Sequence, residues 1–399
     1  MAMSWQDFAV ALDGAPLPSA VIDLDALDRN VDRLRDRVAG SGKTLRVASK
    51  SVRHTGLLRR ILARGGDLFR GLMCFTPREA AWLAAQGFDD LLVAYPSLRG
   101  VDEVAAQVRE GKTIRLMADC EAHLRGYADV AKAHGVELEV LLELDVAYQG
   151  LGGRVHLGVL RSPLRSADAI ERLARRSRSI DGVRVVGMMG YEAQVAGLPD
   201  ATPFSRALNP VRRAIKRLSV PQVAEARAEA VAALRRAGVE ATVVNGGGTG
   251  SVNTTKREDA VTEVTAGSGF SCPHLFDYYR DSPFEPAAFF ALEVVRAPEP
   301  GVVTCLGGGY IASGEPGWDR VPVVHLPEGL EYVTMEGAGE VQTPLRVPDG
   351  LSIGVGDIAV FRHAKAGELA ERFDVYRMAR GREIVAVEPT YRGEGGCFC

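Results

Sequence analysis

The segment LRVASKSVRH, residues 45–54, decides the fold because it joins a strand-like apolar run to a lysine at the end of that strand. Side chains alternate between the two faces of a strand, so Arg46, Ala48 and Lys50 share one face, which we expect to point inward. An arbitrary lysine at a strand end is more often a solvated residue. The segments around Lys50 therefore decide whether it has a chemical role.

Strand-like segments alternate with helical segments over most of the chain. Residues 55–66 form a helical pattern that closes on glycine, and residues 76–87 form one that opens with Thr-Pro and closes on glycine. Such alternation implies parallel strands joined by helical crossovers. Eight such units predict an α/β fold with a closed (β/α)8 TIM barrel, and an open doubly wound sheet is the alternative. The predicted strands are residues 45–49, 67–73, 91–95, 113–119, 138–144, 183–191, 241–245 and 260–266.

The pattern changes after about residue 285, where clusters of glycine and proline separate short alternating runs. This change predicts a β-rich C-terminal domain. We expect residues 20–284 to form the barrel, and residues 1–19 to be an extended segment that joins residues 285–399 in the β-rich domain. Residues 193–220 are expected to be a long, Pro-interrupted connection at the C-terminal rim, where such connections shape an active-site entrance.

The composition excludes several classes of protein. With 399 residues, 46% hydrophobic content and a formal net charge of -3, the chain is neither disordered nor strongly basic. We therefore expect no nucleic-acid partner and no membrane partner. No apolar run approaches the roughly 20 residues that span a bilayer, and the first residues do not form a signal pattern. We expect a cytoplasmic protein whose six cysteines are reduced, because they are too sparse for a disulfide scaffold.

Chemistry in a barrel of this kind is expected at the C-terminal ends of the strands. Lys50 ends the first predicted strand, Tyr191 ends the sixth, and the segment NGGGTGSV, residues 245–252, follows the seventh. Glycines in such a loop let backbone N–H groups approach a phosphate, although the spacing is not that of a dinucleotide fingerprint. A glycine-rich loop alone is more often a turn. Together with a strand-end lysine it predicts a phosphorylated cofactor that bonds covalently to an amine, namely pyridoxal 5'-phosphate (PLP).

Four segments carry a family resemblance and occur in the family's order. The chain resembles the fold-type III PLP enzymes, the alanine racemase group, and is most similar to their D-threonine aldolase and D-serine dehydratase branch. This resemblance implies a barrel with a C-terminal β domain, a homodimer with active sites near the subunit interface, and a small amino acid substrate. The segments are PSAVIDLDALDRNV (18–31), RVASKS (46–51), GMMGYEAQ (187–194), and NGGGTG (245–250) followed by EVTAGSGF (263–270).

The resemblance assigns roles to matching positions. Lys50 is the lysine that would bond to the cofactor, because a buried lysine is a suitable nucleophile for a carbonyl. Tyr191 would lie near the cofactor ring, with a core tyrosine as the alternative. Arg46 would steady the cofactor, with a structural ion pair as the alternative. The positions that match the phosphate loop are Gly247, Gly248, Thr249 and Gly250.

The resemblance does not decide which residue after the fifth strand contacts the cofactor ring. Arg154 and His156 both fall where the family carries an arginine that contacts the cofactor ring, and the extra residues in this segment leave both as candidates. In the β-rich domain, Glu340 and Gln342 lie where relatives carry a Glu-Glu-His run near the active site.

The sequence departs from the family at its metal pair, a histidine followed two positions later by cysteine or aspartate. Here His363 is followed by Lys365, and an ammonium group cannot bind a cation, so we expect no metal at this place. Lys365 would instead bind the substrate β-hydroxyl or act as a general acid, with His363 as proton acceptor. The alternative is that both are surface residues of a degenerate loop. Cys397 and Cys399 would supply thiolates only if the tail folded back, and we expect a mobile tail.

These features predict a PLP-dependent lyase that acts on a β-hydroxy, D-configured amino acid by Cα–Cβ cleavage or by β-elimination of water, without the metal pair. One alternative is a racemase, in which Lys50 and a tyrosine such as Tyr310 work on opposite faces of the cofactor. Another is a non-catalytic PLP carrier, against which the extra domain argues. A sugar-phosphate barrel enzyme is the remaining alternative if Lys50 does not bond to a cofactor.

Overall fold

The computed structural model of the protein describes residues 2–150 and 155–398. This part of the chain forms two compact units. The barrel unit comprises residues 34–50 and 62–267, together with Phe398. The β-rich unit comprises the residues up to 33, residues 51–61 and residues 268–397.

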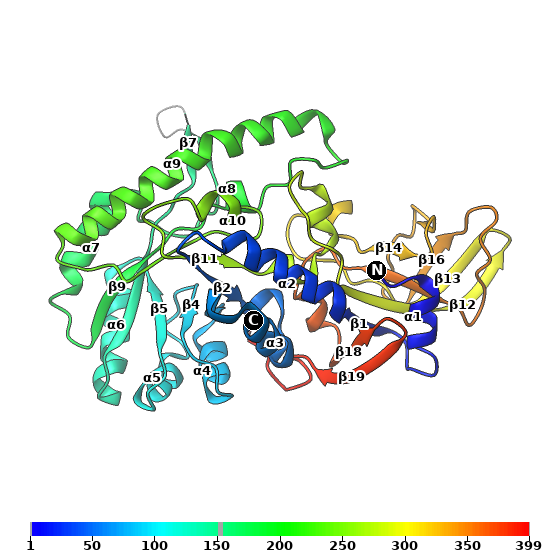
Figure 1. The fold of residues 1–399 in the computed structure, drawn as a ribbon, viewed down its shortest axis with the longest axis horizontal. Coiled ribbons are helices and arrows are strands. Elements are labelled where there is room, and N and C mark those ends of the chain that lie inside the picture. The colour runs from blue at the N-terminus through cyan, green and yellow to red at the C-terminus, as the bar shows by residue number, and fades with distance from the viewer. Residues whose placement is uncertain (1, 151–154, 399) are drawn as a thin grey trace. The chain divides into compact units, whose positions relative to one another are not determined.

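Eight parallel strands close into a barrel in the order β10-β11-β2-β3-β4-β5-β6-β9, which confirms the predicted fold and rules out the open sheet (Figure 1). Closure is completed by β11 beside β2, where Glu263 is opposite Thr44, and by β9 beside β10. The eight segments all coincide with predicted strands. They are β2 (Thr44–Ala48), β3 (Phe69–Cys74), β4 (Leu91–Val93), β5 (Ile114–Ala118), β6 (Leu138–Glu143), β9 (Val183–Met189), β10 (Val243–Gly246) and β11 (Glu263–Ala266).

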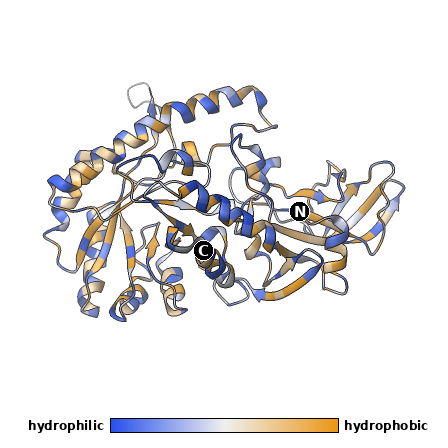
Figure 2. Cartoon of the chain, viewed as in Figure 1, coloured by the Kyte–Doolittle hydropathy of each residue, from blue (hydrophilic) through white to orange (hydrophobic). Residues whose placement is uncertain are grey.

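The strands are buried nearly throughout, because a parallel barrel is covered on the outside by helices and filled on the inside by side chains. One apolar cluster joins Leu92, Met117, Leu141 and Val186 from four of these strands. Hydrophobic residues accordingly dominate the strands, whereas the outer helices carry both hydrophobic and hydrophilic residues (Figure 2).

Helices follow the strands, as βα alternation requires. Their starts use ordinary caps: the Thr76 hydroxyl accepts from the N–H of Glu79, and the Ser166 hydroxyl accepts from that of Ala169. A small antiparallel pair, β7 (Tyr148–Gly150) and β8 (Val155–Leu157), lies between β6 and α7. The helices wholly within the barrel unit are α4 (Pro77–Ala85), α5 (Val101–Arg109), α6 (Glu121–His134), α7 (Ala167–Ser177), α8 (Ala193–Ala196), α9 (Asn209–Arg236) and α10 (Val252–Thr255).

The prediction of a long connection over residues 193–220 is wrong for its second half. Helix α9 begins at Asn209 and continues through Pro221 as one helix, seen beside α7 in Figure 1. Pro210 stands in the first turn, where its missing N–H costs nothing and its fixed φ suits a helix. Pro221 lies further along, inside the same helix, and is tolerated there.

The β-rich unit is built on a nine-stranded sheet, which confirms the predicted β-rich part. Along its main path the order is β15-β16-β13-β12-β1-β18-β19, and β17 joins β14 to β12. Strand β1 (Ser19–Asp23) lies between β12, which is antiparallel to it, and β18, which is parallel. The other strands are β12 (Ala288–Glu299), β13 (Val302–Leu306), β14 (Val323–Leu326), β15 (Glu331–Tyr332), β16 (Gln342–Arg346), β17 (Ile358–Arg362), β18 (Val375–Arg380) and β19 (Glu383–Pro389).

The N-terminal segment, residues 1–19, contributes only Ser19 to strand β1 (Ser19–Asp23), which joins the sheet of the β-rich unit, and the segment is not extended throughout. Residues Trp5–Ala11 form helix α1, because Ser4 and Asp7 make a reciprocal capping box. Phe8 on this helix is buried in a core with Val21, Phe289 and Val360. Helices α2 (Leu24–Val38) and α3 (Thr55–Gly65) each carry the chain between the units, and α11 (Ser268–Ser271) follows β11.

Among residues 2–150 and 155–398, no helix combines the length and the apolar character needed to cross a membrane.

Candidate active site

Lys50 lies at the C-terminal end of β2, in the one-turn 3-10 segment Ser49–Ser51. Its side chain is exposed, so the expectation of a buried lysine is wrong. The reason is local: Ala48 is the last strand residue, and the turn after it carries Lys50 beyond the packed interior of the barrel. Lys50 Nζ donates a hydrogen bond of 3.1 Å to Tyr95 Oη.

Tyr95 follows β4 and is the residue in closest polar contact with the lysine. Lys50 Nζ also lies 5.6 Å from the centre of the Tyr95 ring, and the Arg161 guanidinium lies 5.1 Å from it. Burial opposes ionisation of the Tyr95 hydroxyl, but the positive charges of Lys50 and Arg161 outweigh burial and lower its pKa. The phenol is therefore more acidic than an ordinary tyrosine and is hydrogen-bonded to an amine.

Arg161 links two tyrosines and a buried glutamate. Its guanidinium also lies 5.4 Å from the centre of the Tyr191 ring, and its Nη2 atom lies 2.5 Å from Glu143 Oε1. Burial raises the pKa of Glu143 although Arg161 opposes that shift. Burial likewise raises the pKa of Tyr191 to about 12, so this phenol stays protonated at neutral pH. Arg161 Nε is buried without a hydrogen-bond partner among the described residues, which leaves it able to donate to a bound group.

The glycine-rich loop after β10 turns tightly because of its glycines. Gly247 has φ +94°, a backbone conformation that favours glycine. A Cβ added at Gly248 would lie 2.9 Å from the Ala196 side chain and 3.2 Å from Tyr191 Cε2. Only glycine at this position lets Tyr191 pack against the loop.

A buried glutamate, Glu192, holds this loop from the protein side. It accepts hydrogen bonds from the Gly247 N–H at 3.1 Å, the Ser251 hydroxyl at 2.7 Å and the Thr255 hydroxyl at 2.5 Å. It also forms a buried ion pair with Arg227 of α9. The N–H of Gly248 is used within the loop as well, because it donates to Ser251 Oγ at 3.0 Å. The backbone donors of Gly247 and Gly248 are thus engaged by the protein itself.

Comparison with known proteins identifies this barrel. Residues 22–268 match the family described as alanine racemase, N-terminal domain. The chain belongs to the alanine racemase N-terminal domain family. This match confirms the resemblance indicated by the sequence motifs and covers the strands that carry Lys50, Tyr95, Tyr191 and the glycine-rich loop.

Individual relatives narrow the comparison. The chain is 30% identical over 263 residues to the D-threo-3-hydroxyaspartate dehydratase of Delftia sp. strain HT23, a match that covers 66% of this chain and 62% of the relative. It is 24% identical over 253 residues to the 3-hydroxy-D-aspartate aldolase of Paracoccus denitrificans strain Pd 1222, covering 63% and 59%. The matched part therefore spans about six-tenths of each of these relatives. The solved D-threonine aldolase of Filomicrobium marinum has the same fold, with a TM-score of 0.79, 21% identity and 96% coverage of both chains.

In this member of the alanine racemase family, Arg46 lies in a network of buried ion pairs inside the barrel. Its Nε and Nη2 atoms bind the two oxygens of Glu263 at 2.7 Å and 2.8 Å, and Nη2 binds Asp90 Oδ1 at 3.0 Å. Asn245 adds a hydrogen bond of 2.8 Å to Glu263. These contacts give Arg46 the structural ion pair that was the alternative to a cofactor contact.

The arginine that the structure brings to the tyrosines is Arg161, which the sequence analysis missed. Arg154, one of the two predicted candidates, lies outside the described residues. His156, the other, binds Asp145, with 3.0 Å between Nε2 and Oδ2. Arg161 belongs to the same segment as both, and Tyr95 ends a predicted strand just as Lys50 does, so the strand-end rule could have found Tyr95.

His363 and Lys365 belong to the β-rich unit, just after β17. The His363 ring is buried, lies 2.8 Å from the Lys365 carbonyl oxygen through Nδ1, and also contacts the Tyr310 backbone. Burial lowers its pKa, so the ring is neutral at neutral pH. The Lys365 side chain is 35% exposed, and its Nζ donates to Ser313 Oγ at 3.0 Å and lies 3.8 Å from Glu368 Oε1.

The remaining candidates of the β-rich unit have ordinary surroundings. Tyr310 packs edge-on against Phe290 and Phe373, with ring centres 5.0 Å and 5.4 Å away. Glu340 and Gln342 are exposed.

Proposed function

We propose that this protein is a PLP-dependent lyase that cleaves a Cα–Cβ bond or eliminates water in a β-hydroxy D-amino acid. The observation that carries the proposal is the strand-end amine of Lys50, hydrogen-bonded to the acidified phenol of Tyr95, whose ring Arg161 contacts together with that of Tyr191. The names of the two relatives support the substrate class, since both describe action on 3-hydroxy-D-aspartate. A homodimer is part of this proposal, by resemblance to the family.

The residues present fit PLP. An aldehyde needs an amine, and Lys50 offers an exposed one. A flat aromatic cofactor ring needs hydrogen-bond donors and the faces of other rings, and the buried Nε of Arg161 and the rings of Tyr95 and Tyr191 provide them. A phosphate needs a glycine-rich turn, and the loop after β10 is one.

Each residue then has a stated task. Lys50 Nζ would hold the cofactor, and Tyr95 Oη would take up and return the proton of that amine, because its pKa is lowered. Phosphate binding would fall to the Thr249–Gly250 turn and the Thr249 hydroxyl, since the N–H groups of Gly247 and Gly248 are engaged. When bound, PLP withdraws electrons from the bonds at the substrate Cα.

Lys365 would act on the substrate β-hydroxyl in place of the family's metal pair. Its ammonium group is oriented by Ser313 and by the carboxylate of Glu368, and Ser313 in turn donates to Glu368 at 2.6 Å. A positive charge held in this way can stabilise an alkoxide or protonate a departing hydroxyl. His363 is tied to backbone groups, so we assign it the task of positioning Lys365 rather than that of accepting a proton.

Proton NMR in deuterated water tests the proposal. Purified protein is incubated with D-threonine, D-serine, 3-hydroxy-D-aspartate and the L forms, with and without chelator, and Lys50→Ala is the control. Glycine or a keto acid formed from D substrates despite chelator supports a lyase that does not need the metal pair. Exchange of the α-proton without cleavage would contradict the proposed lyase activity and indicate a racemase instead.

Borohydride reduction followed by mass spectrometry of peptides tests Lys50 separately from the substrate. The expected result is a reduced pyridoxyl group on Lys50. A cofactor trapped on another lysine, or none trapped, would contradict the assignment and reopen the sugar-phosphate alternative.

A further inference from the structure

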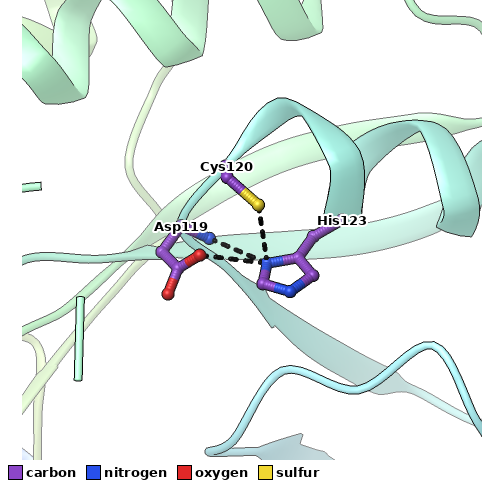
Figure 3. Close-up of side chains that lie close together, drawn as sticks. All are labelled: Asp119, Cys120 and His123. Atoms are coloured by element: carbon purple, nitrogen blue, oxygen red, sulfur yellow. Dashed lines mark hydrogen bonds and ion pairs between the residues drawn. The ribbon is translucent and has the colours of Figure 1, made fainter. Parts of the chain in front are cut away.

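Three metal-ligand side chains meet in the barrel unit where β5 ends and α6 begins. Asp119 follows the last residue of the strand, Cys120 is the N-cap of α6, and His123 lies in the first turn of that helix (Figure 3). Within the part of the chain that the structure describes, they are the one group of three or more His, Cys, Asp or Glu residues whose ligand atoms all lie within 4.8 Å of one another. The proposed PLP site does not use them.

Two distances within this cluster are close to the edges of a metal coordination tetrahedron. His123 Nδ1 lies 3.1 Å from Asp119 Oδ1 and 3.3 Å from Cys120 Sγ. Bonds of about 2.3 Å from zinc to sulfur and about 2.0–2.1 Å to nitrogen or oxygen place neighbouring ligand atoms about 3.3–3.6 Å apart. The two measured edges fall within about 0.3 Å of that geometry. The third edge, from the Asp119 carboxylate to Cys120 Sγ, is within 4.8 Å.

Three polar groups converge on one nitrogen of the His123 ring. His123 Nδ1 has one in-plane position, yet it faces the Asp119 carboxylate, the Cys120 sulfur and, at 3.5 Å, the N–H of Asp119. Without a metal, a proton on Nδ1 can be shared by the Asp119 carboxylate and the Cys120 sulfur, because a thiol sulfur also accepts hydrogen bonds. A cation that takes the place of this proton would meet the same three ligand atoms.

The ring is held in position by its neighbours. His123 stacks on Tyr127 with ring centres 6.2 Å apart and planes at 13°, and the Tyr127 hydroxyl donates to the Met117 carbonyl at 2.9 Å. Asp119 is buried, whereas Cys120 and His123 are partly exposed, which leaves a path for an ion. Cys120 is a free thiol. A rigid ligand set with one open side is the arrangement that binding of a metal requires.

We propose that Asp119, Cys120 and His123 bind a thiophilic divalent cation, with a fourth position open to water or a small ligand. One sulfur, one nitrogen and one oxygen ligand match the preferences of Zn²⁺. The site stands independently of the proposed lyase function. It also has an electrostatic consequence, because the Asp119 charge is one of those that act on Glu143, the partner of Arg161.

Metal titration of the full-length protein, with its cofactor as purified, tests this site without an activity assay. After removal of metal by chelator, Zn²⁺ is titrated by calorimetry and Co²⁺ by absorbance. We expect one site and a thiolate-to-cobalt charge-transfer band. Cys120→Ser should abolish the band and weaken Zn²⁺ binding by at least about 100-fold. His123→Gln should weaken binding but keep the band at saturating Co²⁺.

Two controls keep the test decisive. The double variant Cys397→Ser/Cys399→Ser, in the C-terminal tail, should bind both metals as the unmodified protein does. A band that survives Cys120→Ser and disappears in the tail variant would overturn the proposal, as would the absence of any band or heat in the unmodified protein. Circular dichroism checks folding; if Cys120→Ser is misfolded, equal Zn²⁺ affinity in His123→Gln, Asp119→Asn and the unmodified protein would also overturn it.

Discussion

Replacing Glu192 by glutamine should loosen the glycine-rich loop while leaving its shape almost unchanged. Four donors converge on the two carboxylate oxygens: Arg227 and the Gly247 N–H on one, and the hydroxyls of Ser251 and Thr255 on the other. Glutamine can keep its oxygen toward Arg227 and Gly247, because the two hydroxyls can rotate to accept from its NH₂ group. The variant therefore removes the charge and keeps most of the hydrogen bonds.

The free-energy cost of Glu192→Gln follows from the burial of the ion pair between Glu192 and Arg227. The side chains of Arg227 and Glu192 are 0% and 2% exposed, and Glu258 is the second carboxylate on Arg227, at 2.7 Å. Breaking one partner of a buried pair costs about 3–5 kcal/mol, and the retained hydrogen bonds favour the lower end. About 3 kcal/mol corresponds to roughly a 150-fold change in an equilibrium constant. Hydrogen exchange of the Gly247 amide should accelerate by that factor, as measured by mass spectrometry or NMR.

Glu171 provides the matched control. It is also a glutamate between two arginines, with contacts of 2.8 Å to Arg175 and 2.7 Å to Arg236, but it lies on the surface of the barrel unit. Glu171→Gln should leave exchange in the loop unchanged, because exposed pairs contribute little. Unchanged protection of Gly247 in Glu192→Gln, or an equal loss in Glu171→Gln, would refute the reasoning.

The Glu192 carboxylate makes the stability of the glycine-rich loop depend on pH, and the sign of this dependence follows from its pKa. Burial alone would raise the pKa of Glu192, but Arg227 and the hydroxyls of Thr255 and Ser251 lower it from its ordinary value of 4.5. Its stabilisation is therefore present above pH 4.5 and is lost as the pH falls through the lowered pKa. Loop protection in the unmodified protein should decline on acidification below pH 4.5, and Glu192→Gln should lack this step.

Three further changes test other parts of the site. A spectrophotometric titration should show one tyrosine ionising below its ordinary pKa of 10.0, and Tyr95→Phe should remove that step whereas Tyr191→Phe should not. Lys365→Met should lower kcat on the D-β-hydroxy substrate by on the order of 100-fold or more, with cofactor absorbance unchanged, and undiminished turnover would exclude a role for the ammonium group. Gly248→Ala should cost about 1–3 kcal/mol of unfolding free energy in a denaturant titration, because its Cβ has no room, whereas Gly354→Ala, in open space, should be neutral.

The sequence was sufficient for the architecture because the fold depends on repeated patterns. Every barrel strand coincides with a predicted segment, since burial on both faces makes each strand an apolar run bounded by glycine or helix caps. The start of α9 was missed because the prolines of residues 193–220 were read as interruptions of a connection, whereas Pro210 lies in the first turn of the helix and is compatible with it. Helix α1 was missed because the helix is short and its start is marked only by the capping box of Ser4 and Asp7.

The candidate site was less predictable because it depends on contacts between distant segments. Nothing local to Arg46 shows that Glu263, 217 positions away, binds two of its nitrogens. Likewise the segment that contains Arg161 offers several basic residues, and only its packing beside Tyr95 and Tyr191 distinguishes that arginine from His156. The role of Glu192 in holding the glycine-rich loop was not predicted, because its four hydrogen-bond donors come from segments far apart in the sequence.

The central position of β1 has a consequence for synthesis of the chain. This strand, Ser19–Asp23, is made before residues 34–267, whereas both of its neighbours, Ala288–Glu299 and Val375–Arg380, are made after them. Until then both edges of an apolar strand are open to pairing with another nascent chain. Slow translation of residues 288–380 should therefore promote aggregation, and a chaperone that binds β1 would be of greatest value during that interval.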